Sequence, residues 1–351
     1  MKRIALVLLV ALVASAFSAF GLAETEKPFA GTELTVYNWF DYIDLQVLDI
    51  FEEETGIHIN YANFEENEDM YTRLAAGAGE YDVIIPSEYM IERLIREDRL
   101  EPLDHANIPN MENVIPALLD ASYDPGNTYS VPYMWGTLGI LYNADMVEEP
   151  VTSWDALFDE RYAGKIYMMD SMRDSIGIVL KKLGYSMNST SEEELQEAGE
   201  LLLKQRDDGL IAGYILDTAK DKMASNEAVM AVMYNGDAMY AIKDNPSLVY
   251  VIPEEGSNVW VDAMCIPKGS AHKEAAELFI DFMCRPDIAK MNVDEIRYSP
   301  LIRQVVEGLS EEELASTAMN PSEEELARCE YYHDISDVAW MYDDVWMDVT
   351  F

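Results

Sequence analysis

Residues 258–267 read NVWVDAMCIP, a β-rich run that carries a tryptophan and an aspartate two positions apart. In a strand, Trp260 and Asp262 extend from the same face, so an indole ring stands beside a carboxylate. This pair suits an organic ammonium ion, because the carboxylate accepts charge-assisted hydrogen bonds from an NH3+ group and the indole face attracts the cation. The alternative is a half-buried strand with Trp260 in a hydrophobic core and Asp262 at its edge. Similar rings and carboxylates elsewhere in the chain favour the first interpretation.

The first third of the chain alternates predicted strands and helices. We expect strands at residues 34–39, 57–64 and 81–86, separated by amphipathic helices over 44–55 and 67–76. This order implies a parallel sheet, and ligands bind such sheets beyond the carboxyl ends of the strands. The side chains that fall at this edge are Trp39, Tyr42, Ser87 and Tyr89.

The middle of the chain repeats this arrangement. Strands are predicted at residues 138–142, 165–170 and 229–234, and strands at 249–252 and 260–266 return the chain to its first part. Acids, a hydroxyl and a ring again follow the strand ends: Asp170, Ser171, Asp174, Tyr234 and Asp237. Capping of the helix that follows is the alternative role for Asp170, Ser171 and Asp174.

Helix signals continue to the C-terminus. We expect a helix over residues 111–119 and a helical, acidic region over 309–351. The signature Ser-x-x-Glu begins at Ser191, Ser310 and Ser322, and each occurrence predicts the start of a helix.

The length of 351 residues is enough for two lobes, each with its own core, and the apolar content of 49% is typical of a globular chain. The predicted strands pass between the lobes more than once, and this chain connectivity is typical of a two-lobed protein with a hinge. We expect one lobe to comprise residues 32–137 plus 263–308. The other comprises 138–262 plus 309–351, with a ligand cleft between the two.

The N-terminus carries an export signal. Lys2 and Arg3 precede an apolar run over residues 4–22, and small residues lead to Ala23. This pattern predicts a signal peptide over residues 1–23 that is cleaved, with a single membrane anchor as the alternative. Because no cysteine follows the run, a lipoprotein anchor is not expected, and the predicted location is the periplasm.

The net charge of −42 is extreme. Removal of residues 1–23 takes away Lys2, Arg3 and no acid, which changes −42 to −44. Such a surface repels nucleic acid and raises the local concentration of cations. Solubility in a salty habitat is the alternative reason for most of the acids. We expect the protein to be a monomer.

Motifs for catalysis and for cofactors are missing from the sequence. It contains no P-loop, no GxGxxG or GxSxG string, no HExxH and no EF-hand loop. The three cysteines, Cys265, Cys284 and Cys329, form no ligand cluster, although one disulfide remains an option. We therefore expect no enzyme activity, no metal and no cofactor. A secreted carbohydrate-active enzyme that uses paired carboxylates is the alternative, because it needs no motif.

Six strings, in order, resemble the periplasmic spermidine/putrescine-binding proteins of ABC importers over nearly the whole mature chain. They are YNWFDYI (37–43), YDVIIPSEYM (81–90), YSVPYMWGTLGILYN (129–143), VTSWDALFDERYAGKI (151–166), VWVDAMCIPKGSAHKEAAELFIDFM (259–283) and RPDIAK (285–290). The resemblance implies an α/β fold of the type II periplasmic-binding-protein class. In this clamshell each lobe is a mainly parallel sheet flanked by helices, and crossing strands join the lobes. It also implies a polyamine ligand and a membrane permease as partners.

The resemblance also assigns site residues. Those that it places around the ligand are Trp39, Tyr42, Ser87, Tyr89, Asp174, Tyr234, Trp260, Asp262 and Tyr298. In this assignment the rings cover the methylenes of the polyamine, and the carboxylates receive its ammonium groups.

Several positions depart from the spermidine-type pattern. Where this chain has Phe40, Ser171 and Tyr234, that pattern has threonine, aspartate and tryptophan. The pattern also has a glutamine, which aligns only loosely near Tyr332. Asp237 stands where spermidine-type members have serine and putrescine-type members have aspartate. One acid is lost and one is gained, so we favour putrescine and retain spermidine. Another small organic cation is a further alternative ligand.

Overall fold

The computed structural model describes residues 27–77 and 81–350, so the predicted signal peptide lies outside the described residues. The first lobe is built on three parallel strands. The central strand β1 (Glu33–Trp39) pairs with β2 (His58–Phe64) on one side and with β3 (Val83–Ile84) on the other. The predicted strand, helix, strand, helix, strand order is confirmed here.

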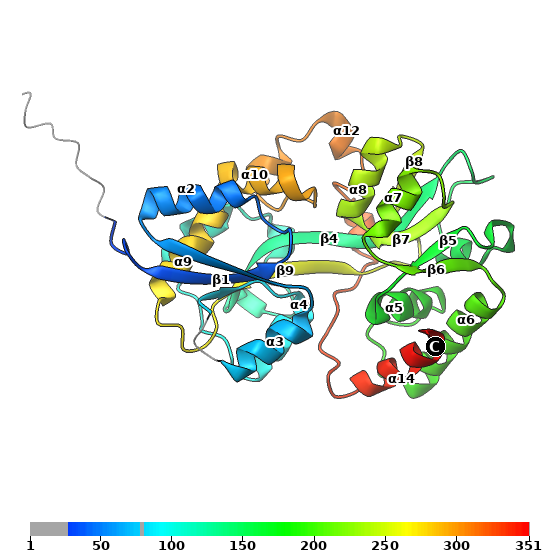
Figure 1. Ribbon diagram of the computed structural model, residues 1–351, viewed down its shortest axis with the longest axis horizontal. Helices are drawn as coiled ribbons and strands as arrows, with labels where there is room; N and C mark the ends of the chain where they lie inside the picture. Colours follow the sequence, from blue (N-terminus) through cyan, green and yellow to red (C-terminus); the bar gives the residue numbers. More distant parts are fainter. Residues whose placement is uncertain (1–26, 78–80, 351) are drawn as a thin grey trace, which may run out of the picture.

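Helices cover both faces of this sheet, as Figure 1 shows. On one face lie α2 (Leu45–Thr55), α9 (Lys273–Met283) and α10 (Pro286–Ile296). On the other lie α3 (Asn67–Ala76) and α4 (Glu88–Arg96). Local signals set the ends of α2: the Asp44 side chain accepts from the amide of Gln46, and Gly56 ends the helix at a φ of 73°.

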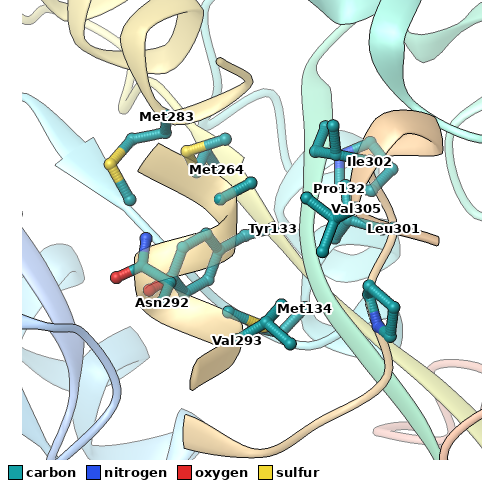
Figure 2. A pocket seen from close by; sticks show the side chains of 12 residues that line it. Pro132, Tyr133, Met134, Met264, Met283, Asn292, Val293, Leu301, Ile302 and Val305 are labelled. Atoms are coloured by element: carbon teal, nitrogen blue, oxygen red, sulfur yellow. The ribbon is translucent and has the colours of Figure 1, made fainter. Parts of the chain in front are cut away.

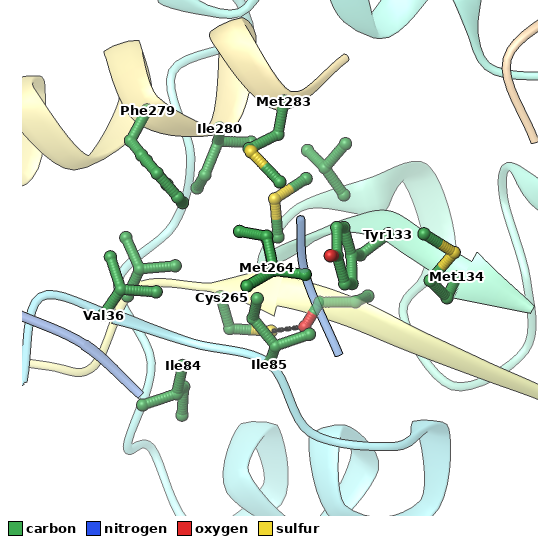
Figure 3. Packing of buried hydrophobic residues seen from close by; sticks show 14 of the residues in the cluster. Val36, Ile84, Ile85, Tyr133, Met134, Met264, Cys265, Phe279, Ile280 and Met283 are labelled. Atoms are coloured by element: carbon green, nitrogen blue, oxygen red, sulfur yellow. Dashed lines mark hydrogen bonds between the residues drawn. The ribbon is translucent and has the colours of Figure 1, made fainter. Parts of the chain in front are cut away.

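Apolar side chains from the helices and the sheet meet in the core of the first lobe (Figure 3). Phe279, Ile280 and Met283 of α9 face Val36 and Ile85 of the sheet, and Ile84 points to the opposite face. Cys265 is buried in this core, and its thiol donates to the carbonyl of Ala263 at 3.7 Å. Cys265, Cys284 and Cys329 are all free thiols.

Two long strands connect the lobes. The first part of β4 (Ser130–Asn143) pairs antiparallel with β9 (Val259–Cys265), and its second part pairs with β7 (Met230–Tyr234) and β8 (Leu248–Val251). Because β9 also pairs with β3, the strands form one sheet in the order β2-β1-β3-β9-β4-β7-β5-β6, with β8 on β4; here β5 is Ile166–Met169 and β6 is Ile211–Ile215.

The second lobe is built on β7 together with two strands parallel to it, β5 (Ile166–Met169) and β6 (Ile211–Ile215). Figure 1 shows α5 (Met172–Lys182), α6 (Glu192–Asp207) and α14 (Ala339–Thr350) on one face of its sheet. The other face carries α7 (Thr218–Ala224) and α8 (Asn235–Asp244).

Short helices follow α10 along the chain: α11 (Arg303–Val306), α12 (Glu311–Leu314) and α13 (Glu323–Leu326). Ser310 and Ser322 form complete capping boxes, and the Ser191 side chain caps α6, so the three predicted helix starts are confirmed.

Two helix predictions were wrong. Residues 111–119 form no α-helix but fall in separate 3-10 turns, Pro109–Asn113 and Pro116–Leu118. Pro116 disfavours helical geometry at the residue before it, and Ile115 is extended, with a ψ of 135°. The region 309–351 is only partly helical. Its irregular segment 327–338 instead crosses the lobe boundary, where the amide of Val259 donates to the carbonyl of Glu330 at 3.0 Å.

The cores of the two lobes meet within β4. Residues up to Trp135 belong to the first core, and those from Leu138 onward to the clusters of the second lobe. Residues 259–261, which the predicted division assigns to the second lobe, pack in the first core. Tyr89 and Tyr234 pack against the cores of both lobes. Across the described ranges 27–77 and 81–350, no helix combines the length and the apolar character needed to cross a membrane.

Candidate functional site

Asp262 on β9 is a buried carboxylate whose partners are hydroxyl groups. Its side chain is 6% exposed, and its two oxygens accept hydrogen bonds from Tyr42 Oη at 2.8 Å and Ser87 Oγ at 2.7 Å. Burial raises the pKa of this carboxyl to about 6, although both hydrogen bonds oppose the shift. Among the described residues, Asp262 has no salt bridge, so its charge is left without a counterion.

Asn67 fixes the hydroxyl groups around Asp262. Its amide donates to Ser87 Oγ at 3.1 Å and to Tyr89 Oη at 3.0 Å, which leaves the Ser87 hydroxyl to donate to Asp262. Sequence reasoning did not select Asn67. It begins α3 just after the end of β2, so the rule that placed residues at the carboxyl ends of strands could have found it.

Asp174, in the first turn of α5, is a second buried carboxylate held by hydroxyl groups. It is 3% exposed, and it accepts from Ser171 Oγ at 2.6 Å, Tyr234 Oη at 2.8 Å and Tyr332 Oη at 3.1 Å. Ser171 also caps α5, as the alternative interpretation had it. Burial raises the pKa of Asp174, against the effect of these three hydrogen bonds. Within residues 27–77 and 81–350 it also has no salt bridge.

Aromatic rings connect the two carboxylates. The ring of Trp260 lies edge to face with that of Tyr298, with 4.9 Å between centroids, and with that of Tyr234 at 6.0 Å. Tyr298 in turn contacts the ring of Tyr42 at 5.9 Å. Since Tyr234 donates to Asp174 and Tyr42 donates to Asp262, the rings form a continuous path from one acid to the other.

Two glycines allow this path to pack closely against the backbone. A Cβ at Gly136 would lie 2.6 Å from the Trp260 ring, and one at Gly236 would lie 2.4 Å from the Tyr298 ring. Asn235, beside Gly236, accepts from the amide of Thr137 and donates to Ser299 Oγ, which ties α8 to β4 and to the loop that carries Tyr298. Neither glycine nor Asn235 was among the predicted residues.

Trp39 and Phe40 lie at the carboxyl end of β1. The Trp39 ring packs on Phe64 with 4.5 Å between centroids, and Phe40 is 65% exposed. In the part of the chain that the structure describes, no hydrogen bond joins either side chain to the groups around Asp262 or Asp174.

Asp237 has a cationic partner within the protein. Its Oδ1 lies 3.2 Å from Nζ of Lys220 on α7. The predicted site residue Asp237 is therefore neutralised, unlike Asp262 and Asp174. Lys220 was not considered from the sequence, because it lies 17 residues earlier in an exposed-looking helix.

Glu88, another residue that sequence reasoning missed, joins three segments beneath the site. It is fully buried, and its carboxylate accepts from the amides of Val261 and Tyr332, both at 3.1 Å. Burial raises the pKa of Glu88 to about 8. From the sequence, Glu88 looks like an ordinary acid in the first turn of a helix, so no local signal reveals this role.

A small cavity in the first lobe is separate from this site. Figure 2 shows it among Tyr133, Met134, Met264, Met283 and Asn292. Its volume is about 10 Å³, room for one water molecule. Among the described residues, no group of three or more His, Cys, Asp and Glu side chains is placed to hold a metal ion.

The chain is similar to several known binding proteins. It is 31% identical over 335 residues to the spermidine/putrescine-binding periplasmic protein of Escherichia coli, covering 95% of each chain. It is also 31% identical to a putrescine-binding periplasmic protein of Pseudomonas aeruginosa, again over 95% of each. A spermidine/putrescine ABC transporter substrate-binding protein of Streptococcus pneumoniae has a TM-score of 0.82 and 39% identity, covering 91% of this chain and 98% of that one.

A second solved structure, a putative spermidine/putrescine ABC transporter from Listeria monocytogenes, gives a TM-score of 0.83 at 36% identity over 91% of this chain and 99% of that one. These structures confirm the predicted two-lobed α/β fold. The family model for bacterial extracellular solute-binding proteins matches residues 46–321. The chain belongs to the bacterial extracellular solute-binding proteins.

Proposed function

We propose that the protein captures a polyamine, putrescine or spermidine, and delivers it to an ABC importer. The observation that carries this proposal is the pair of buried carboxylates, Asp262 and Asp174, which accept hydrogen bonds from hydroxyl groups and form no salt bridge among the described residues. A path of aromatic rings connects them. The names of the relatives from Escherichia coli and Streptococcus pneumoniae point to the same ligand class.

The energetics favour a ligand with a charge at each end. Ionised Asp262 and Asp174 are costly in a dry site, and each raised pKa reflects that cost. An ammonium group at each carboxylate removes this cost and adds charge-assisted hydrogen bonds. The methylenes between the ammonium groups lie along Trp260 and Tyr298, which attract them by apolar contact and the cations by their ring faces.

Ligand binding closes the two lobes. Tyr89 and Tyr234 already pack against both cores, so the site spans the boundary between lobes. The connections that can bend are β4, β9 and the segment 327–338, which together form the hinge. The ligand favours the closed form because only in this form do both of its ammonium groups pair with carboxylates.

The proposed ligand contacts are the predicted residues around Asp262 and Asp174. They are Tyr42, Ser87, Tyr89, Ser171, Asp174, Tyr234, Trp260, Asp262 and Tyr298, with Tyr332 added. Trp39 and Phe40 are proposed to cover the ligand from the carboxyl end of β1. The division into lobes at residues 32–137 plus 263–308 and 138–262 plus 309–351 is proposed with the exception of residues 259–261, which pack in the first core.

The cellular role follows from the same proposal. The family is one of solute-binding proteins, and the matched relatives are periplasmic. We propose that residues 1–23 are cleaved during export, that the monomer works in the periplasm without catalytic activity, and that its closed form docks to a membrane permease.

Titration calorimetry on unfolded, ligand-stripped and refolded protein tests this function. Putrescine, spermidine and spermine are the ligands, with lysine as a diamine that also carries a carboxylate and butylamine as a ligand with one charge. We expect tight binding of putrescine or spermidine and at least about a hundredfold weaker binding of butylamine, since one carboxylate stays unpaired. No heat and no thermal stabilisation with any polyamine would refute the proposal, and other cations and sugars would then be screened.

A further inference from the structure

We propose that Lys220 serves as a built-in cation that occupies Asp237 and so restricts the site to ligands whose charges match Asp262 and Asp174. Lys220 is then a specificity-determining residue that disfavours the longer polyamines. This inference rests on the proposed polyamine function and deepens it, since it concerns which members of that ligand class are preferred.

The ion pair is set between two helices. Lys220 lies on α7 and Asp237 in the first turn of α8, with 3.2 Å between Nζ and Oδ1. Their side chains are 34% and 23% exposed, so the pair is partly shielded from solvent. Burial opposes the charge on Lys220, but Asp237, Asp217 and Asp221 raise its pKa, so the lysine stays protonated.

Asp237 adjoins the ring path. The preceding residue, Gly236, lies directly against the ring of Tyr298, and Tyr234 donates to Asp174. The charges of Asp237 and Asp262, after burial, raise the pKa of the Tyr298 hydroxyl, which places both acids near that group. A ligand ammonium group that paired with Asp237 would therefore lie at the edge of the proposed polyamine site.

This geometry predicts how many ammonium groups of a ligand the site can pair with carboxylates. Of the three acids near the rings, Asp262 and Asp174 form no salt bridge among the described residues, and Asp237 is paired with Lys220. A diamine supplies one ammonium group for each of the two open acids. The third ammonium group of a triamine finds its carboxylate already occupied, and it is repelled by Lys220.

Lys220→Met tests the inference, because methionine keeps the apolar stem and removes the charge. Lys222→Met is the matched control: it lies on the same helix, and its partner is the exposed Glu227 on the outer surface. Dissociation constants for putrescine and spermidine are measured for both variants and for the unmodified protein. A double variant, Lys220→Met with Asp237→Asn, removes the freed carboxylate as well.

We expect Lys220→Met to shift the affinity ratio toward spermidine by about tenfold, the size of one added charge-assisted hydrogen bond. The control should leave the ratio unchanged, and the double variant should restore it. An unchanged ratio in Lys220→Met, or an equal shift in Lys222→Met, would overturn this inference while leaving the proposed function intact. Failure of the unmodified protein to bind any polyamine would instead overturn the proposed function.

Discussion

At the scale of single residues, we expect the proposed site to gain affinity for a cation at the expense of stability. Asp262 is ionised in a dry place, with hydroxyl groups alone as partners. We therefore expect Asp262→Asn to weaken polyamine binding by about 2 to 5 kcal/mol. The same change should raise the stability of the ligand-free protein at pH 7.5 by up to about 3 kcal/mol, because the amide need not carry a buried charge. Calorimetry and thermal melting measure the two effects; binding within twofold of the unmodified protein would refute the assigned role.

The raised pKa of Asp262 also predicts how binding depends on pH. The folded value of about 6 lies above the ordinary value of 3.8, so the folded chain holds the proton more tightly between these two values. This group's contribution to stability is therefore present below about pH 4 and is lost as the pH rises through 6. Affinity for a cation changes in the opposite direction and should fall about tenfold between pH 7.5 and pH 5. A flat affinity profile over this range would contradict the account.

At the scale of elements, α8 positions the rings as well as an acid. Gly236 lies in its first turn, where a Cβ would come 2.4 Å from the Tyr298 ring. We expect Gly236→Ala to displace that ring and weaken polyamine binding at least about tenfold, with a folded protein, because overpacking costs about 1 to 3 kcal/mol. Gly308→Ala is the control, since the nearest atom to its Cβ is 3.4 Å away. Equal affinities for the two variants would show that Tyr298 has no part in binding.

At the same scale, local signals were enough to predict most elements and to select most of the proposed ligand contacts. Strand periodicity placed Tyr42 and Ser87 beyond strand ends and Asp262 on the same strand face as Trp260, and the structure joins Tyr42 and Ser87 to Asp262 by hydrogen bonds. Tyr332 could not be found in this way, because it reaches Asp174 from 158 residues away through an irregular segment. The prediction of a helix over 111–119 was wrong because apolar spacing was given more weight than Pro116.

At the scale of the whole molecule, the charge of −42 should act on the rate of capture. A strong negative field accelerates the encounter with a cation and is screened by salt. We expect the association rate of a polyamine, followed by stopped-flow tryptophan fluorescence, to fall at least about tenfold between about 0.02 and 0.5 M salt. The dissociation rate should change far less, because contacts inside the closed site are screened less. An association rate that is independent of salt would leave the acidic surface without a role in capture.

The crystal structure of the protein with its preferred polyamine tests the central claim most directly. The account predicts closed lobes, with one ammonium nitrogen within about 3 Å of Asp262 and another within about 3 Å of Asp174. It also predicts that the methylenes lie against Trp260 and Tyr298, and that Lys220 remains on Asp237. A ligand bound elsewhere, or one whose ammonium groups avoid both buried carboxylates, would contradict the account.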